Sequence, residues 1–167
     1  MKRIVFLIGA IILLISNSFA AELSSASYSH LPALVYPIVK PKVTSKFGLR
    51  KHPILRVVKH HSGIDLAVPK GSLVRAVADG VVVFSDPFKG YGNLIVIQHK
   101  NGYTSHYGHL EKILVYPGKK VSAGEIIGTV GSTGLATGPH LHLEIRKNGK
   151  PLNPLLIFPS LTSKSKG

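Results

Sequence analysis

Two runs of strand-forming residues flank a turn signal near the middle of this chain, and this arrangement sets the expected fold class. The first run covers residues 94–99 and the second covers residues 103–107, with Lys100-Asn101-Gly102 between them. Both runs are rich in branched or aromatic side chains, which favour strands. Asn-Gly between such runs is a strong hairpin signal, because both residues tolerate the left-handed backbone of a tight turn. We therefore predict an antiparallel hairpin here.

Other segments carry the same β signals. Residues 74–83 are rich in valine and are interrupted by Asp79-Gly80, a turn pair, so Asp79 is interpreted as a turn residue. Residues 126–130 and 141–145 add two more candidate strands. No window has a convincing helical period. The chain is therefore predicted to be all-β.

A weak internal repeat refines this expectation. Residues 71–76 (Gly-Ser-Leu-Val-Arg-Ala) are echoed by residues 118–123 (Gly-Lys-Lys-Val-Ser-Ala), and a glycine-containing turn and an apolar strand follow each copy. Two similar units packed together would give an antiparallel sandwich or barrel-sandwich hybrid, built on a duplicated hybrid motif with an open groove. The alternative is a chance similarity between short turn-and-strand segments.

The N-terminus has the composition of an export signal. A charged start is followed by an apolar run over residues 4–15 and then by small residues up to Ala20-Ala21. This order is typical of a secretory signal peptide, which we assign to residues 1–20. The run is shorter than the roughly 20 residues of a membrane span, so no span is expected after signal removal. The alternative is an uncleaved anchor.

The remaining boundaries follow from composition. Residues 21–41 contain serine and proline without a sustained period and are interpreted as a linker or N-terminal arm. The compact domain is expected over residues 42–158, and residues 159–167 are expected to form a basic, flexible tail. The mature protein is predicted to be exported, to the periplasm or else as a secreted or wall-associated protein.

The chain is strongly basic and contains no cysteine. The formal net charge is +14, so the surface should attract a polyanion. The basic residues are scattered singly rather than clustered in an arm or stripe, which argues against nucleic acid as the partner. For an exported protein, contact with an anionic wall or lipid surface is the better expectation. Without disulfides, the domain must depend on core burial or on a metal.

Histidines and one aspartate form the main chemical signal. His140 and His142 lie two apart in a predicted strand and share a face, so either or both can reach one ion. His61 and Asp65 can meet only if Ser62-Gly63 bends the chain. Together with His109, these residues can provide a zinc site with a position left open for water. The alternatives are exposed strand histidines and a hairpin with an incidental histidine.

Glu144 and His60 lie close in sequence to the candidate ligands. Glu144 lies on the same face as His142 and is a candidate general base, but the His-Glu-x-x-His motif that uses glutamate in this way is absent. Contacts around the ligands are the stronger interpretation for Glu144. His60 is expected to face away from the site.

Five short motifs resemble the catalytic domain of the M23 family, the lysostaphin-type and LytM-type peptidoglycan endopeptidases. They occur in family order and spacing over residues 43–157. The motifs are Phe47-Gly48-Leu49-Arg50-Lys51-His52-Pro53, His61-Ser62-Gly63-Ile64-Asp65, Gly90-Tyr91-Gly92-Asn93, Tyr107-Gly108-His109-Leu110, and Gly131-Ser132-Thr133-Gly134 leading to His140-Leu141-His142.

The resemblance implies a role for each site residue. One zinc ion per chain would be held by His61, Asp65 and His142, while His109 and His140 would act near the metal-bound water. It also implies peptidoglycan as the substrate, hydrolysed at peptide cross-links or stem peptides. A non-catalytic LytM-like module that binds the wall or activates amidases is the alternative. The family also has latent members in which an upstream residue covers the metal, so residues 21–41 could partly cover the groove.

Departures from the family pattern are mild. Leu143 stands where phenylalanine is common, and His106 stands where an apolar residue is usual, so His106 could sense pH or have no role. A lipoyl-type or biotinyl-type carrier domain shares a similar β unit, but such carriers usually have methionine beside the modified lysine. The only methionine here is Met1. The resemblance does not specify which wall bond is cut.

Overall fold

The computed structural model describes residues 34–51 and 56–161. These residues lie within one compact unit of the chain. The predicted signal peptide, most of the predicted arm and the end of the predicted tail lie outside the described residues. No helix in the described part of the chain is long and apolar enough to cross a membrane.

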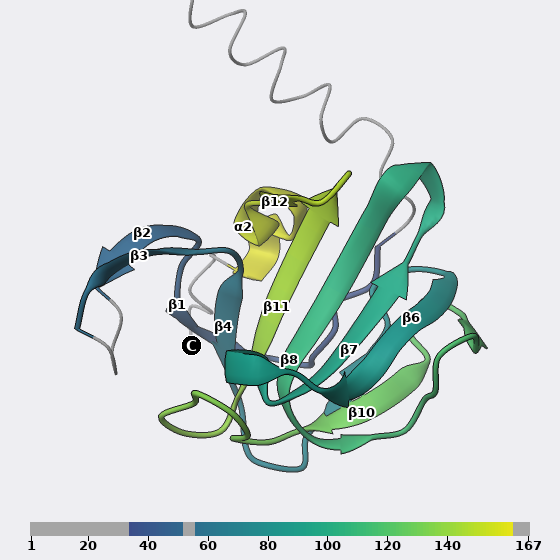
Figure 1. The fold of residues 1–167 in the computed structure, drawn as a ribbon, viewed down its shortest axis with the longest axis horizontal. Helices are drawn as coiled ribbons and strands as arrows, with labels where there is room; N and C mark the ends of the chain where they lie inside the picture. Colours follow the sequence, from purple (N-terminus) through teal and green to yellow (C-terminus); the bar gives the residue numbers. More distant parts are fainter. Residues whose placement is uncertain (1–33, 52–55, 162–167) are drawn as a thin grey trace, which may run out of the picture. The chain divides into compact units, whose positions relative to one another are not determined.

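Strands make up most of the regular secondary structure of the described residues, which confirms the all-β prediction (Figure 1). The strands are β1 (Lys42–Ser45), β2 (Gly48–Lys51), β3 (Val58–His61), β4 (Ile64–Ala67), β5 (Leu73–Arg75), β6 (Gly80–Pro87), β7 (Asn93–Gln98), β8 (Tyr103–Ile113), β9 (Lys120–Val121), β10 (Ile126–Val130), β11 (His140–Lys147) and β12 (Lys150–Leu152). The short helical segments are η1 (Lys89–Tyr91), η2 (Lys100–Gly102), α2 (Pro154–Ile157) and η3 (Pro159–Leu161).

One antiparallel sheet dominates the domain. Its main path runs in the order β1, β4, β11, β8, β7, β6, β9, and β5, β10 and β12 pair at its sides. Strands β2 and β3 form a separate two-stranded hairpin beside β4 (Figure 1). Successive side chains of each strand point to opposite faces of the sheet, so one face can form the core while the other carries the site residues.

The predicted central hairpin is confirmed as β7 and β8. Asn101 has φ 56° and ψ 30°, and Gly102 has φ 70°, so both occupy the left-handed region that the turn requires. Strand β8 continues to Ile113, well beyond the predicted run, and so carries His109 into the sheet. A strong turn signal therefore located the hairpin but not the end of its second strand.

Strands β4 and β11 place the site residues opposite one another. Leu141 pairs with Leu66 and Leu143 pairs with Ile64, and all four side chains are fully buried. Because side chains alternate along a strand, His140 and His142 lie on the other face of β11. In the same register His142 is directly opposite Asp65.

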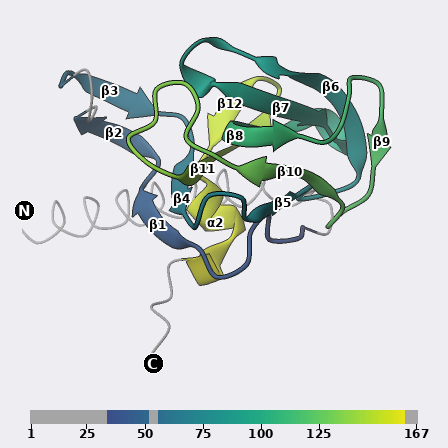
Figure 2. The ribbon, with the colours of Figure 1, turned by 90° about the horizontal axis from the view of Figure 1, so that it is seen from below.

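The internal repeat is also visible in the backbone. Gly71 N–H donates to the Val130 carbonyl and Gly118 N–H donates to the Val82 carbonyl, each at 2.8 Å. The short strand of each copy thus pairs with the long strand of the other copy, β5 with β10 and β9 with β6. In Figure 2, β5 and β10 lie together on one side of the molecule. The two copies therefore exchange strands rather than simply stacking as separate units.

Residues 34–41 of the predicted arm pack on the domain. Val35 N–H donates to the Val77 carbonyl at 2.7 Å, and Arg75 N–H donates to the Pro37 carbonyl at 2.9 Å. Ile38 is buried, and the Tyr36 ring contacts the Phe158 ring with centroids 5.2 Å apart. This segment lies along β5 and α2. The rest of the arm lies outside the described residues, so covering of the groove stays a prediction.

Candidate metal centre

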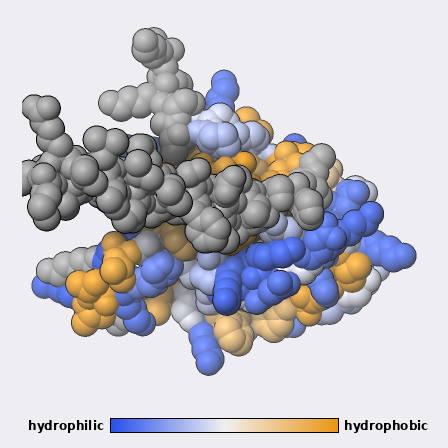
Figure 3. All heavy atoms as spheres, turned by 90° about the horizontal axis from the view of Figure 1, so that it is seen from above, coloured by the Kyte–Doolittle hydropathy of each residue, from blue (hydrophilic) through white to orange (hydrophobic). Residues whose placement is uncertain are grey.

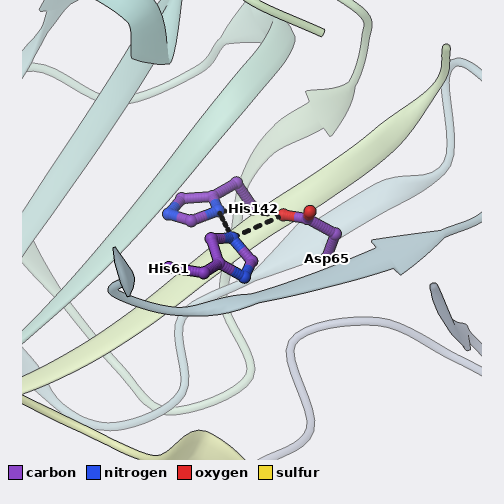
Figure 4. A group of neighbouring side chains, drawn as sticks. All are labelled: His61, Asp65 and His142. Atoms are coloured by element: carbon purple, nitrogen blue, oxygen red, sulfur yellow. Dashed lines mark hydrogen bonds and ion pairs between the residues drawn. The ribbon is translucent and has the colours of Figure 1, made fainter. Parts of the chain in front are cut away.

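Three side chains from three strands converge at one point (Figure 4). His61 ends β3, Asp65 lies in β4 and His142 lies in β11. His61 Nε2 lies 3.2 Å from Asp65 Oδ1 and 3.1 Å from His142 Nδ1, and His142 Nδ1 lies 2.9 Å from Asp65 Oδ1. The structure thus brings together the three residues that the sequence analysis named as metal ligands.

The bend between β3 and β4 depends on Gly63. A Cβ atom at this position would lie 2.2 Å from the Leu143 carbonyl oxygen, far inside contact distance. Only glycine lets the turn pass this close to β11. The bend that the sequence analysis required between His61 and Asp65 is therefore present, and it brings together ligands that a straight strand would separate by about 13 Å.

Outer hydrogen bonds fix which ring nitrogen of each histidine faces inward. His61 Nδ1 donates to the Lys46 carbonyl at 2.9 Å, and His142 Nε2 donates to Glu144 Oε1 at 3.0 Å. In the neutral form of each ring, the opposite nitrogen carries a lone pair and points at Asp65. Burial lowers the pKa of His142, but its contacts with Asp65 and Glu144 outweigh this and raise it. The three donor atoms therefore favour a positive charge between them.

This donor set fits a metal cation. Zinc held at about 2.0–2.2 Å by tetrahedral ligands separates its donor atoms by about 3.3–3.6 Å, slightly more than the 2.9–3.2 Å found here. The three side chains are buried, with 8%, 9% and 6% of the surface of His61, Asp65 and His142 exposed. Burial alone would raise the pKa of Asp65, but its contacts with His142 and His61 outweigh this and hold the pKa below its ordinary value. The carboxylate is therefore ionised at neutral pH and ready to bind a cation.

Glu144 supports the site from behind. Its side chain is completely buried and accepts hydrogen bonds from Ser62, from Tyr91 at 2.7 Å, from His142, and from Arg146 Nε at 2.7 Å. Burial alone would raise the pKa of Glu144, but the hydrogen bonds from His142 and Ser62 outweigh burial and lower this pKa below its ordinary value. The carboxylate therefore stays charged. Glu144 thus holds His142 in the orientation that presents Nδ1, and it does not face the cavity.

His109 and His140 stand next to the three donors without joining them. Their rings have centroids 4.7 Å apart, and the His109 ring lies 5.9 Å from that of His142. His109 Nδ1 donates to the Thr133 carbonyl and His140 Nδ1 donates to the Gly138 carbonyl, each at 2.8 Å. In each neutral ring Nε2 is therefore left as a proton acceptor.

The backbone of His109 is unusual. Its φ is 61°, in the left-handed region that few residues other than glycine adopt. Backbone strain of this kind persists only where the surroundings hold it, and it is common at functional sites. Burial lowers the pKa of His109 to about 4, so the ring is neutral at pH 7.

A cavity of about 320 Å³ opens onto these groups. It is lined by Arg50, Lys59, His60, His61, Ser62, Asp65, Phe88, Lys89, Gly90, Tyr91, His109, Leu135, Thr137, His140 and His142. His60 borders the cavity, but it is exposed and adjacent to buried His61 in β3, so the two side chains turn to opposite faces of the strand and the expectation that His60 faces elsewhere stays a prediction. The His60 ring also contacts the edge of Phe47, with centroids 4.8 Å apart.

Three further features of the sequence analysis are Asp79, His106 and the loop over residues 131–134. Asp79 lies in the bend that precedes β6, which confirms its assignment as a turn residue, and it accepts a hydrogen bond from Ala123 N–H at 2.8 Å. Burial lowers the pKa of His106 to about 4, so this histidine does not titrate near neutral pH. The 131–134 loop contacts His140 through Gly131 and also positions His109 through Thr133, a role that the sequence analysis missed.

Comparison with known proteins fits this geometry. The model of peptidase family M23 matches residues 59–154. The chain belongs to this family. It is 47% identical over 135 residues to the "DD-carboxypeptidase/endopeptidase Mpg" of Neisseria meningitidis serogroup B, covering 79% of this chain and 31% of that protein. It is 46% identical over 122 residues to the "Peptidoglycan DD-endopeptidase ShyA" of Vibrio cholerae, covering 72% and 28%.

Solved M23 structures share the fold. A zinc-containing peptidase from Vibrio cholerae superposes with a TM-score of 0.68 at 40% identity, covering 72% of this chain and 39% of that one. The catalytic domain of lysostaphin from Staphylococcus simulans gives 0.64 at 32% identity, covering 74% and 93%. The chain thus spans about a third of the length of the curated relatives and nearly all of an isolated catalytic domain.

Proposed function

We propose that this M23 chain is a zinc-dependent endopeptidase that hydrolyses peptide cross-links or stem peptides of bacterial peptidoglycan. The observation that carries the proposal is the convergence of His61, Asp65 and His142 beside two further histidines in one cavity. Two relatives are named DD-endopeptidases or carboxypeptidases, which favours an amide between two D-configured residues as the bond cut.

In this proposal the three convergent side chains hold the metal. His61 Nε2, Asp65 Oδ1 and His142 Nδ1 are the ligand atoms, and Lys46 and Glu144 keep the two rings in the required tautomers. Zinc in such a site supplies a Lewis acid that polarises a carbonyl and makes water more acidic. The open side of the three donors faces the cavity, where the substrate carbonyl would lie.

His109 and His140 would handle the protons. A neutral His109 can accept a proton at Nε2 from the attacking water as its oxygen bonds to the carbonyl carbon. His140 Nε2 lies 3.7 Å from Asp65 Oδ1, so His140 is close enough to share this work, and once protonated at Nε2 it can donate a hydrogen bond to the developing oxyanion. The protonated imidazole would then return the proton to the leaving amine as the carbon–nitrogen bond breaks.

The proposed location follows from the substrate. A wall hydrolase must act outside the cytoplasm, and the periplasm fits the N-terminal signal pattern best. The basic composition would assist binding to an anionic wall or lipid surface. Nucleic acid is not proposed as a partner.

Digestion of purified wall tests the proposal. The zinc-loaded protein should release soluble fragments from purified sacculi, and mass analysis should find one added water for each bond cut, with a new amine and a new carboxyl group. His142→Ala should release none. Binding of the zinc-loaded protein to sacculi without any fragment release would instead support a non-catalytic wall-binding module.

A further inference from the structure

Two cations face the cavity from the β2–β3 hairpin. Arg50 and Lys59 are directly opposite in the register of the two strands, and both line the cavity. Like charges opposite one another on an antiparallel pair are destabilising. In Figure 3 the end of the molecule formed by this hairpin shows hydrophilic and apolar side chains side by side. An anion bound between the two cations would relieve their repulsion on the cavity side of the hairpin.

The described residues of the chain supply that anion only in part. The Arg50 guanidinium lies 3.4 Å from Asp65 Oδ2, a long contact, while Asp65 Oδ1 is directed at the two ligand histidines. Arg50 Nε is buried and has no hydrogen-bond partner among the described residues. Lys59 is exposed and enters no ion pair within the described part of the chain.

The cations are close to where the chemistry is proposed. Arg50 contacts Asp65, and Asp65 is one of the three convergent donors. A substrate carbonyl held at those donors would therefore place the neighbouring substrate residue near the guanidinium. The cavity lining also includes Phe88, Tyr91 and Leu135, together with a third cation, Lys89. Asp65 is the only acidic side chain among the described residues that line the cavity. Apart from Asp65, the charged side chains other than histidine that line the cavity are therefore cations, which suits a carboxylate on the substrate.

We infer that Arg50, assisted by Lys59, binds the α-carboxylate of the substrate residue that carries the leaving amine. This inference rests on the proposed function. An amide between two D-centres of wall peptides has a carboxylate beside its nitrogen whether the leaving residue is a terminal D-alanine or the diamino acid of a neighbouring strand. A guanidinium matches a carboxylate with two parallel hydrogen bonds. The same site would thus accept both terminal and cross-linking residues.

The test uses two matched synthetic peptides containing a D-alanyl amide to a D-residue, one with a free α-carboxylate on the leaving residue and one with a carboxamide there. The kcat/KM ratio between them is measured for the zinc-loaded wild type and for Arg50→Gln, Arg50→Lys and Lys59→Gln. Lys120→Gln removes one charge on β9, away from this cavity, and is the matched control. Zinc content is measured for every variant, because Arg50 contacts Asp65.

The wild type should prefer the carboxylate peptide by about 10- to 100-fold, the usual contribution of a charged hydrogen-bonded pair. Arg50→Gln should bring the ratio close to one with zinc retained, Arg50→Lys and the exposed Lys59→Gln should give intermediate ratios, and Lys120→Gln should keep the wild-type ratio. Equal wild-type rates on both peptides would overturn the inference while leaving the proposed function intact. An unchanged ratio in Arg50→Gln, with both rates reduced, would also overturn it. Wild-type protein that cleaves neither peptide would contradict the proposed function itself.

Discussion

At the scale of single residues, buried Glu144 shows how the site is held. A fully buried carboxylate is costly unless it is paired, and Glu144 is paired with Arg146 and with three neutral or titratable donors. One of these, His142, is a proposed ligand, and another, Tyr91, lines the cavity. Glu144 therefore links the metal ligand to the cavity wall through a single charged group.

Glu144→Gln should weaken zinc binding while preserving the volume of the side chain. The amide cannot accept from all the donors that the carboxylate serves, so His142 loses the partner that fixes its tautomer. We expect affinity to fall about 10- to 100-fold, as for other partners of metal-bound histidines. Competitive zinc titration measures this, with Glu111→Gln, which removes the half-buried carboxylate partner of Lys70, as control. Equal affinity in both variants would show that Glu144 does not position His142.

His109→Ala and His140→Ala should each retain one zinc per chain and the fold, yet lose about 10²–10⁴ in rate on wall substrate, the usual contribution of a positioned acid or base. The reason is that both rings stand outside the close group of three donors, whose atoms lie within 3.2 Å of one another, while His140 Nε2 lies 3.7 Å from Asp65 Oδ1. Elemental analysis and rate measurements on the same samples test this. Loss of zinc in His140→Ala, with zinc kept in His142→Ala, would mean that the two roles are exchanged.

Sequence reasoning named the five histidine and aspartate positions because these residue types carry recognisable metal and proton chemistry. It could not name the carbonyls of Lys46 and Thr133 that orient His61 and His109, since a backbone acceptor leaves no side-chain signature. Tyr91 lay within a quoted motif, but its bond to Glu144 joins residues 53 positions apart and follows only from the fold.

At the scale of elements, the β3–β4 bend and the β4–β11 register build the site together. The register sets Asp65 opposite His142, and the bend returns His61 to both. Apolar alternation predicted strand β11 and the face of its histidines. The pairing partner could not be predicted, because alternation fixes which face is buried but not which strand lies alongside.

Gly63→Ala should disrupt this arrangement. The added Cβ would lie 2.2 Å from the Leu143 carbonyl, so the backbone must shift and separate His61 from Asp65. We expect the free energy of unfolding to fall by about 1–3 kcal/mol, as in other overpacked sites, together with weaker zinc binding. Gly138→Ala is the matched control, because a Cβ there meets nothing within 4 Å. Denaturant titration of both variants decides the point, and equal stabilities would refute the steric argument.

At the scale of the whole molecule, the exchanged repeat ties the domain together. Strands β5 and β9 are three and two residues long, too short to show any period in sequence, and each is stabilised by the long strand of the other copy. The repeat was visible in sequence because its turn glycines recur, with φ 87° at Gly71 and 90° at Gly118. The exchange was not visible, since strand pairing over such distances is a property of the packed domain.

Stability should depend on pH through buried His106. Burial lowers its folded pKa to about 4, below the unfolded value of about 6.5, so the unfolded chain binds more protons between these values. The contribution of His106 is therefore fully favourable above about pH 6.5 and is lost as pH falls toward 4. Relative to His106→Gln, the wild type should lose up to about 1.4 kcal/mol per pH unit in this window. Urea titrations with chelator present measure the difference, with the exposed His60→Gln as control; parallel profiles for wild type and His106→Gln would contradict it.

In the proposed function, one metal ion held by His61, Asp65 and His142 is required for hydrolysis of wall peptides. Zinc is titrated into chelator-stripped protein while hydrolysis of a purified cross-linked muropeptide dimer is followed by mass spectrometry. We predict that the rate rises linearly and saturates at one zinc per chain, with two monomer products and one water gained, and that His142→Ala stays inactive throughout. Full activity of the stripped protein, or no hydrolysis at one zinc per chain, would contradict the account.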